Sequence, residues 1–330
     1  MRSVEELIGK HMQRRPAAER SLLEFCDYLA EALHPARRER APSVEDVVHA
    51  FRQFWRVPVP VGPYLEELCR KMGVAFLRHE NIAGIDACSD FDGETQRWEI
   101  YVRSDVGLRE GLCVLREVFK ILSRQAYESV SWWSDWLAAG QTASANRLAS
   151  RFAYAVVLPP KQFGEAALTH GLNPWTLATC FLTTPGACFF ALTRTLRLPA
   201  PYFQAHLNFR PPTPEQTRLC FTNESVQAQV WRKSLSRVYG RPGEQWPEME
   251  ALAAGFPATG RILEADGMLL EAIRSCRSVM ETTDHLAGIK LPHPVCVVAR
   301  PNGMAQSQMF VQAVPHDYAG LLMEVSGSEI

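Results

Sequence analysis

The chain has 330 residues, of which 47% are hydrophobic and 22% charged, and its 35 basic and 36 acidic side chains leave a net charge of -1. This usage is typical of globular proteins, and the near-zero charge excludes a strong overall attraction to nucleic acid. No apolar run approaches the ~20 residues that span a bilayer, and two acids stand where a signal peptide carries positive charge, so we expect a cytoplasmic protein without a membrane partner.

The nine cysteines are spread singly along the chain, and no pair has the CxxC spacing of zinc or redox sites. Free thiols in a reducing compartment are therefore expected. A chain of this length predicts two or three domains, each with its own core.

Residues 1–57 are predicted to form a helical N-terminal region. Ser43 is the expected N-cap of its second helix, and Arg37, Arg38 and Arg40 lie in the charged loop before it. These arginines are candidate DNA contacts, although so short a basic cluster is more often a solvated loop. Two stripes of apolar residues recur at helical spacing, namely Leu22, Phe25, Cys26, Leu29 and Leu33, and Val44, Val47, Val48, Phe51 and Trp55.

Three prolines within 57–63 predict a domain boundary, because proline fixes φ and removes a backbone donor. The pattern beyond them predicts an α+β central domain with a small sheet over 58–200, built from a helix at 64–72, strands at 74–77 and 98–102, a turn at 90–93, and helices at 108–125 and 143–157.

Two helical segments suggest a family. One reads Leu-Arg-Glu-Val-Phe-Lys-Ile-Leu at 115–122, and the other contains Ser-Arg-Phe-Ala-Tyr-Ala-Val-Val-Leu-Pro at 150–159. Their order and residues resemble the ImmA/IrrE metallopeptidases, in which the first helix carries His-Glu-x-x-His and the second a glutamate before Ala-Asn-x-Phe-Ala. The resemblance implies a zincin-like central domain.

The zinc ligands of that family are missing. By the resemblance, Arg116 and Lys120 stand in place of the two histidines, and Asn146 stands in place of the third ligand. Arginine has no lone pair to offer, and lysine would first have to lose its proton. The sequence therefore predicts no bound metal, no cofactor and no metal-dependent catalysis.

Glu117 keeps the identity of the catalytic glutamate, but an ion pair with a neighbouring cation is the favoured interpretation. Cys113 lies one helical turn before it and could be a thiol nucleophile; a buried small hydrophobe is the better interpretation, since no histidine lies between His79 and His170. The tryptophans Trp132, Trp133 and Trp136 are expected in a core or interface.

The segment 173–197 is predicted to be two short helices around a tight turn, similar to the helix-turn-helix-like segment that follows the peptidase core in some relatives. Arg194 and Arg197 are candidate DNA contacts there, but Phe189, Phe190 and Leu192 favour structural packing.

A C-terminal α+β domain is expected over 215–330, after linkers at 197–201 and 210–214. Helices are predicted at 226–238 and 262–279, and strands at 294–299 and 308–314 are predicted to be joined by a turn at 301–303. Some relatives carry a GAF-like sensor domain at this end, so a sensory role is an expectation of the resemblance.

Together these features predict a pseudopeptidase, meaning a non-catalytic regulator in stress response or gene regulation that binds a protein or DNA. The resemblance implies an XRE-type repressor as one protein partner. Two alternatives remain, a DNA-binding transcription factor and a zinc-independent hydrolase with a rebuilt active site. Strongly salt-dependent DNA affinity would favour the first alternative. Chelator-resistant cleavage that fails in Glu117→Gln would favour the second.

Overall fold

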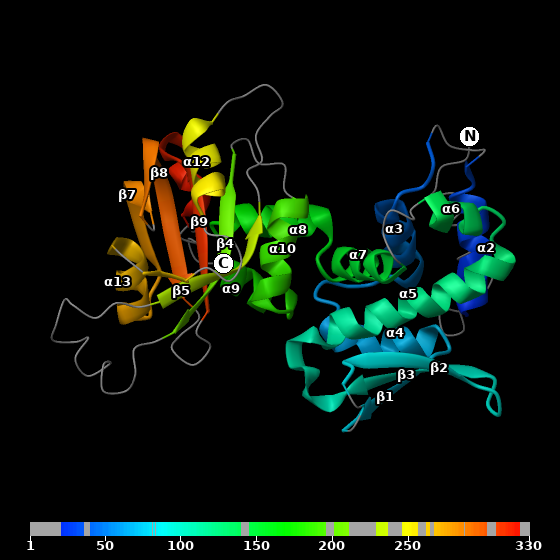
Figure 1. Ribbon diagram of the computed structural model, residues 1–330. Coiled ribbons are helices and arrows are strands. Elements are labelled where there is room, and N and C mark those ends of the chain that lie inside the picture. Colours follow the sequence, from blue (N-terminus) through cyan, green and yellow to red (C-terminus); the bar gives the residue numbers. More distant parts are fainter. Residues whose placement is uncertain are drawn as a thin grey trace. The chain divides into compact units, whose positions relative to one another are not determined.

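The computed structural model describes residues 21–35, 40–80, 82, 84–139, 145–195, 201–210, 229–236, 246–256, 262–264, 267–286, 288–301 and 308–323. The chain divides into two compact units, one of Met1–Pro160 with Ala178–Ala187, the other of Lys161–Leu177 with Cys188–Ile330. Each unit contains helices and a β-sheet, which confirms the predicted α+β class (Figure 1).

The helices of the first unit surround an aromatic core. The ring of Phe152 lies 5.1 Å from the rings of both Phe51 and Phe119, and all three side chains are buried. Both predicted N-terminal stripes are buried as well. The helices are α2 (Leu22–Ala32), α3 (Val44–Trp55), α4 (Leu65–Lys71), α5 (Glu110–Ser129), α6 (Trp133–Ala139) and α7 (Ala145–Val157), with 3-10 turns at Gly62–Tyr64 and Ser104–Arg109.

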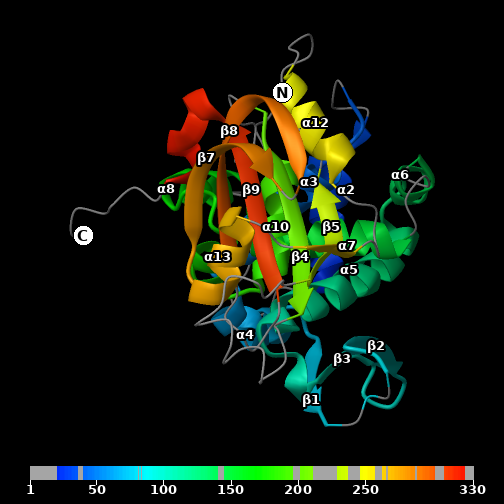
Figure 2. The same ribbon diagram turned by 60° about the vertical axis from the view of Figure 1, so that its left-hand side comes forward.

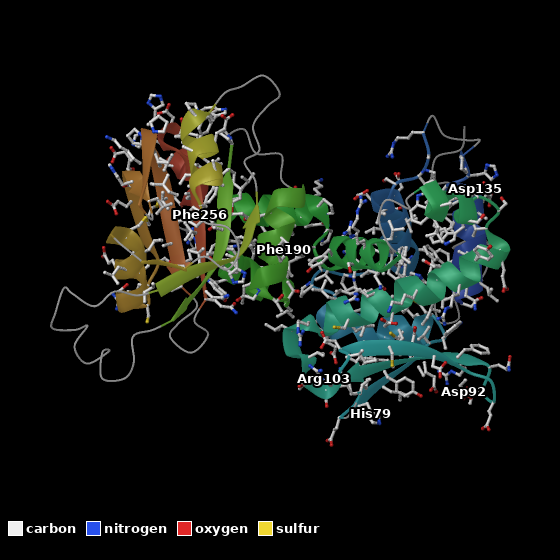
Figure 3. The ribbon with its side chains drawn as sticks, in the orientation of Figure 1. His79, Asp92, Arg103, Asp135, Phe190 and Phe256 are labelled. Atoms are coloured by element: carbon white, nitrogen blue, oxygen red, sulfur yellow. The ribbon has the colours of Figure 1, made fainter. Side chains whose placement is uncertain are left out.

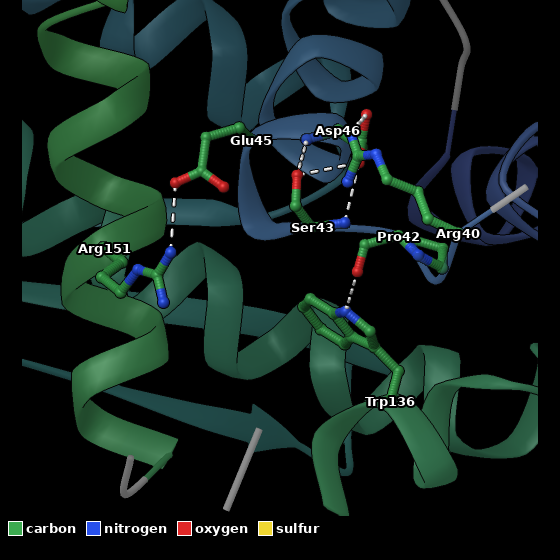
Figure 4. Close-up of polar contacts among 7 residues, drawn as sticks. All are labelled: Arg40, Pro42, Ser43, Glu45, Asp46, Trp136 and Arg151. Carbon is green, nitrogen blue, oxygen red and sulfur yellow. Dashed lines mark hydrogen bonds and ion pairs between the residues drawn. The ribbon is translucent and has the colours of Figure 1, made fainter. Parts of the chain in front are cut away.

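The N-cap predicted for α3 is present (Figure 4). The Ser43 hydroxyl accepts a hydrogen bond from the Asp46 backbone N–H at 3.2 Å, and the Asp46 carboxylate accepts one from the Ser43 N–H at 2.7 Å. This capping box satisfies two backbone donors at the helix start. Trp136 of α6 donates to the carbonyl of Pro42 at 2.7 Å, and Arg151 of α7 pairs with Glu45 at 3.2 Å.

The boundary predicted at 57–63 falls inside the first unit. Arg52 of α3 explains this continuity, because its guanidinium donates to the carbonyls of Val156 at 2.5 Å and of Val57 at 2.9 Å. Burial lowers the pKa of this arginine. The N-terminal helices therefore share a core with α5 and α7.

A three-stranded sheet lies against α5 (Figure 1). Its strands are β1 (Ala75–His79), β2 (Ala87–Asp92) and β3 (Arg97–Arg103), in the order β1-β3-β2, with β1 parallel and β2 antiparallel to β3. His79 and Arg103 are register partners on the side of the sheet away from α5 (Figure 3).

The sequence prediction missed β2. Asp90, Phe91 and Asp92 belong to this strand, and the turn follows at 93–96. The Asp92 carboxylate accepts from the backbone N–H groups of Glu94 at 2.9 Å and Thr95 at 3.3 Å. Acidic residues on a half-exposed edge strand look like turn residues in the sequence, because they occur in both settings.

The second unit is built on a six-stranded antiparallel sheet in the order β6-β5-β4-β9-β8-β7. Its strands are β4 (Phe203–Arg210), β5 (Gln229–Ser236), β6 (Ile262–Glu264), β7 (Val279–Leu286), β8 (Ile289–Pro301) and β9 (Gln308–Pro315). The remaining elements are α8 (Pro160–Thr169), α9 (Pro174–Phe181), α10 (Pro185–Thr195), α12 (Pro247–Gly255), α13 (Gly267–Ser275) and a 3-10 turn, η4 (His316–Leu322). The ends Ala178–Phe181 of α9 and Pro185–Ala187 of α10 belong to the first unit.

One face of this sheet is apolar and packs against α12 and α13 (Figure 2). Leu252 of α12 and Leu269 of α13 are fully buried in that core. Every second residue of three neighbouring strands joins them, as the two-residue period of a strand requires: Phe203, Ala205 and Leu207, then Val295, Val297 and Ala299, then Met309, Val311 and Ala313.

Several C-terminal predictions were wrong. The stretch predicted as a helix at 226–238 contains strand β5, which pairs with both β4 and β6, and strand β4 was not anticipated. The helix predicted at 262–279 is reduced to α13, because Ile262–Glu264 pairs with β5 as strand β6 and because Cys276, at φ +54°, leaves the helical region after Ser275. The strands predicted at 294–299 and 308–314 are confirmed as parts of β8 and β9. Most of the predicted linkers and of the 301–303 turn lies outside the described residues.

Candidate functional site

Glu117 of α5 lies at the centre of the segment that resembles a peptidase motif in sequence, and it is 3% exposed. One carboxylate oxygen accepts from the Lys120 ammonium at 2.6 Å, and the other accepts from the Ser89 hydroxyl of β2 at 3.0 Å. The ion pair expected for Glu117 is therefore present. A carboxylate with both oxygens engaged is poorly placed to take a proton from a substrate water.

The residues aligned with the zinc ligands of the metallopeptidase motif do not fit zinc. Arg116 and Lys120 are one helical turn apart on α5, and both carry cationic groups, whereas zinc ligands need a free lone pair. Asn146 lies in the first turn of α7, and its side chain is exposed. The backbone carbonyl of Asn146 accepts a hydrogen bond from the Ser150 hydroxyl at 2.8 Å. This donor set supports no zinc-dependent step.

Cys113 has the environment of an inert thiol. Its side chain is 6% exposed, and burial raises the pKa of the thiol. Cys88 of β2 is half-buried, and its pKa is also raised, first by burial and then by Glu117. Nucleophilic cysteines need the opposite shift, toward the thiolate. The interpretation of Cys113 as a buried hydrophobe is therefore the one that the structure favours.

Within the described ranges, no three His, Cys, Asp or Glu side chains are grouped so that they could hold a metal ion. No single helix in the same ranges is long and apolar enough to cross a bilayer. The helices α9 and α10 pass this test of length and composition only when they are taken together, and they are bent by 111° relative to each other.

No family model and no curated protein matches the chain. Among solved structures it is similar to a "Mycobacterium tuberculosis transcriptional regulator" at 13% identity and a TM-score of 0.46, over 94% of this chain and 86% of that chain. So low a likeness carries no argument about function.

The candidate DNA contacts are only partly described. Arg40 is exposed and pairs with Asp46 at 3.1 Å (Figure 4). Arg37, Arg38 and Arg197 lie outside the described residues, as does the side chain of Arg194 on α10. One exposed ion pair at a helix start is typical of a solvated surface.

Within the segment 173–197, the described residues to Thr195 form two short helices, α9 and α10, around a tight turn, as predicted. Their 111° bend lies in the usual helix-turn-helix range. Most described side chains of α10 are nevertheless buried, and Phe189 stacks on Phe310 with ring centroids 4.7 Å apart. Phe190 is the one exposed residue among the described side chains of α10, so that part of the helix, which does not include Arg194, presents little surface that could read DNA.

The second sheet carries a buried polar network that sequence reasoning missed. Gln312 donates to the carbonyl of Leu172 at 2.8 Å and to the Tyr202 hydroxyl at 2.5 Å, and the Tyr202 hydroxyl donates to Gln204 at 2.8 Å. Arg300 donates to Gln312 at 3.1 Å and to the carbonyls of Gly171 at 3.0 Å and Leu322 at 2.9 Å. The alternation of polar and apolar residues along β4, and the polar Gln312 within the apolar run of β9, are the signals that could have indicated it.

Proposed function

We propose that this protein is a non-catalytic regulator that acts by binding another macromolecule through a peptidase-like scaffold of the ImmA/IrrE type. The observation that carries the proposal is the engagement of Glu117 by Lys120 and Ser89. The family's metal chemistry needs two imidazoles beside a free carboxylate. Here the same helical turn holds two cations and a bonded carboxylate, so binding is the activity left to the scaffold.

A protein partner fits this site better than DNA does. Acidic residues accompany the basic ones on α5, and the described part of α10 is mostly buried. The XRE-type repressors that active relatives cleave are our leading class of partner. We assign the second unit a sensory role of the GAF-like kind, which a six-stranded antiparallel sheet with helices is compatible with.

The first experiment measures zinc in the purified full-length protein by elemental analysis, after incubation with excess zinc and dialysis, together with hydrolysis of fluorescent casein. We expect far less than one zinc per chain and no hydrolysis. Near-stoichiometric zinc would contradict the proposal, as would hydrolysis that resists chelators and fails in Glu117→Gln.

A restoration variant tests the scaffold itself. The triple substitution Arg116→His, Lys120→His and Asn146→Glu rebuilds the three ligands that the resemblance implies, and we expect it to gain about one zinc per chain with a tetrahedral site. Arg147→Glu in place of Asn146→Glu is the matched control, because it places the carboxylate on a different face of α7. Equal zinc in both triple variants would refute the zincin-like arrangement and leave the lack of catalysis standing.

A further inference from the structure

Three polar residues form a donor face along α5. Arg116, Lys120 and Ser123 follow one another at intervals of four and three residues, so they share one side of the helix. Glu117 borders this face on the side toward β2, and Phe119 borders it on the side toward α7. The donor face thus lies between the sheet and α7.

Two donors of this face lack a hydrogen-bond partner. The Arg116 Nε and the Ser123 Oγ are both buried, and no described residue bonds either atom. A buried donor left unbonded costs more free energy than a typical hydrogen bond contributes, so a bound water or ligand that accepts from it would be stabilised. Lys120 has its one described ion pair with Glu117 and remains 35% exposed.

The charge balance of the face favours an anionic group. Arg109, at the start of the same helix, is neutralised by Asp86 at 2.8 Å, and Lys120 is neutralised by Glu117. In the part of the chain that the structure describes, no carboxylate lies in ion-pair distance of Arg116 or of Arg124, which is exposed.

An aromatic surface continues the donor face. The Arg124 guanidinium lies over the Trp98 ring at 5.2 Å, and Phe91 packs edge-on against Trp98 with 43% of its own surface exposed. The indole N–H of Trp98 is also buried without a partner among the described residues. A ligand here therefore meets donors at one end and an exposed ring at the other.

We propose that the donor face of α5 binds a short acidic segment of a partner protein, with a carboxylate on Arg116 and Ser123 and an apolar side chain against Phe91 and Trp98. This deepens the proposed function, on which it rests, by assigning the chemistry of its partner. Arginine forms paired, charge-assisted hydrogen bonds with carboxylates. A nucleic-acid strand fits less well, because it carries a phosphate at every nucleotide and would bring several of them near Glu117, Asp86 and Asp90, whereas the proposed segment places one carboxylate on Arg116 and Ser123.

The test measures fluorescence anisotropy of a labelled peptide of alternating Glu and Val added to the full-length protein, with the Gln-Val peptide as its neutral counterpart. We expect the acidic peptide to bind and the neutral one to bind about tenfold or more weakly. Arg116→Gln should weaken binding of the acidic peptide by a similar factor. Arg70→Gln, which removes an exposed charge from α4, should leave it unchanged.

Ser123→Ala separates binding from folding. Because the hydroxyl has no described partner, its removal should leave the urea midpoint of the free protein unchanged or raised. The same substitution should lower the affinity for the acidic peptide several-fold. Equal affinities of wild type, Arg116→Gln and Ser123→Ala would overturn the proposal, as would no binding by the wild type.

Labelled duplex and single-stranded DNA serve as the competing probes. DNA affinity that falls in Arg116→Gln, with no affinity for the acidic peptide, would assign the face to nucleic acid and overturn the proposal. If the acidic peptide does not bind, the zinc and casein results still stand, so the non-catalytic role and the acidic partner are tested separately.

Discussion

Glu117 and Lys120 show how one residue pair decides the chemistry of α5. The carboxylate is almost fully buried, and the ammonium at 2.6 Å is its nearest cation. The effect of such a pair on stability appears mainly when one partner is removed, because the remaining buried charge is then poorly solvated. The same ion pair removes the proton acceptor that a peptidase would need.

Lys120→Met should therefore lower the free energy of unfolding by about 1–3 kcal/mol, since it leaves the Glu117 carboxylate with Ser89 alone. The double variant Glu117→Gln/Lys120→Met should recover most of the loss, because the amide carries no charge. Urea unfolding of the single and double variants measures the coupling between the two residues. Additive losses would show that the pair is not formed.

Buried thiols make the protein's stability depend on alkaline pH. Burial raises the pKa of Cys69 to about 12 and of Cys26 to about 11, from 9.0. The unfolded chain therefore loses these protons first, and stability should fall as the pH rises from about 9 toward 11–12. Urea midpoints measured across this pH range check the prediction, and a midpoint that stays constant would contradict it.

Alkylation gives the matching kinetic prediction. At about pH 8, iodoacetamide should label the exposed Cys180 and leave Cys26, Cys69 and Cys113 unlabelled until urea unfolds the chain. Mass spectrometry of the digested protein locates the modified residues. Early labelling of Cys113 would favour the alternative of a thiol nucleophile.

At the scale of elements, α3 was predictable because its signals are local. Ser43 and Asp46 cap its first turn, and the apolar stripe of this helix sets the buried face. Strand β5 was not predictable in the same way. Its hydrogen bonds go to β4 and β6, which are distant in the sequence, so the pairing overrides a local pattern of helical spacing.

Ser43→Ala should destabilise the first unit by about 1 kcal/mol, because the Asp46 backbone N–H at the start of α3 loses the hydroxyl that accepts its hydrogen bond. Ser150→Ala is the control: this hydroxyl bonds the Asn146 carbonyl within a helix, so its loss should change stability little. Thermal unfolding followed by circular dichroism compares the two variants. Equal losses would mean that the cap contributes nothing specific.

At the scale of the whole molecule, Arg300 joins parts of the second unit that lie far apart in the chain. Its side chain bonds Gly171, which precedes α9, and Leu322, at the end of η4. Both of these hydrogen bonds are buried, as is the arginine itself. The planar guanidinium thus holds three segments together, namely its own strand β8, the residues before α9 and the end of η4.

Arg300→Met should lower the free energy of unfolding by roughly 3–5 kcal/mol, because several buried acceptors lose their donor together. Arg300→Lys should recover little of the lost free energy of unfolding, since an ammonium cannot reproduce the planar set of guanidinium donors. Arg277→Gln, at an exposed position of the same unit, should change stability by less than about 0.5 kcal/mol. Urea unfolding compares the three variants, and a small effect of Arg300→Met would show that water satisfies these carbonyls.

The sequence by itself determined the α+β class, the two N-terminal helices with the Ser43 cap, the helices that bear Glu117 and Phe152, and the unsuitability of the Arg116 and Lys120 side chains as zinc ligands. These follow from short-range spacing and from the chemistry of single side chains. Only the tertiary structure decided that Ser89 bonds Glu117, that Arg116 and Ser123 keep buried donors unbonded among the described residues, and that β4 to β9 form one sheet. Each of these depends on contacts between residues distant in the chain, which a local pattern does not encode.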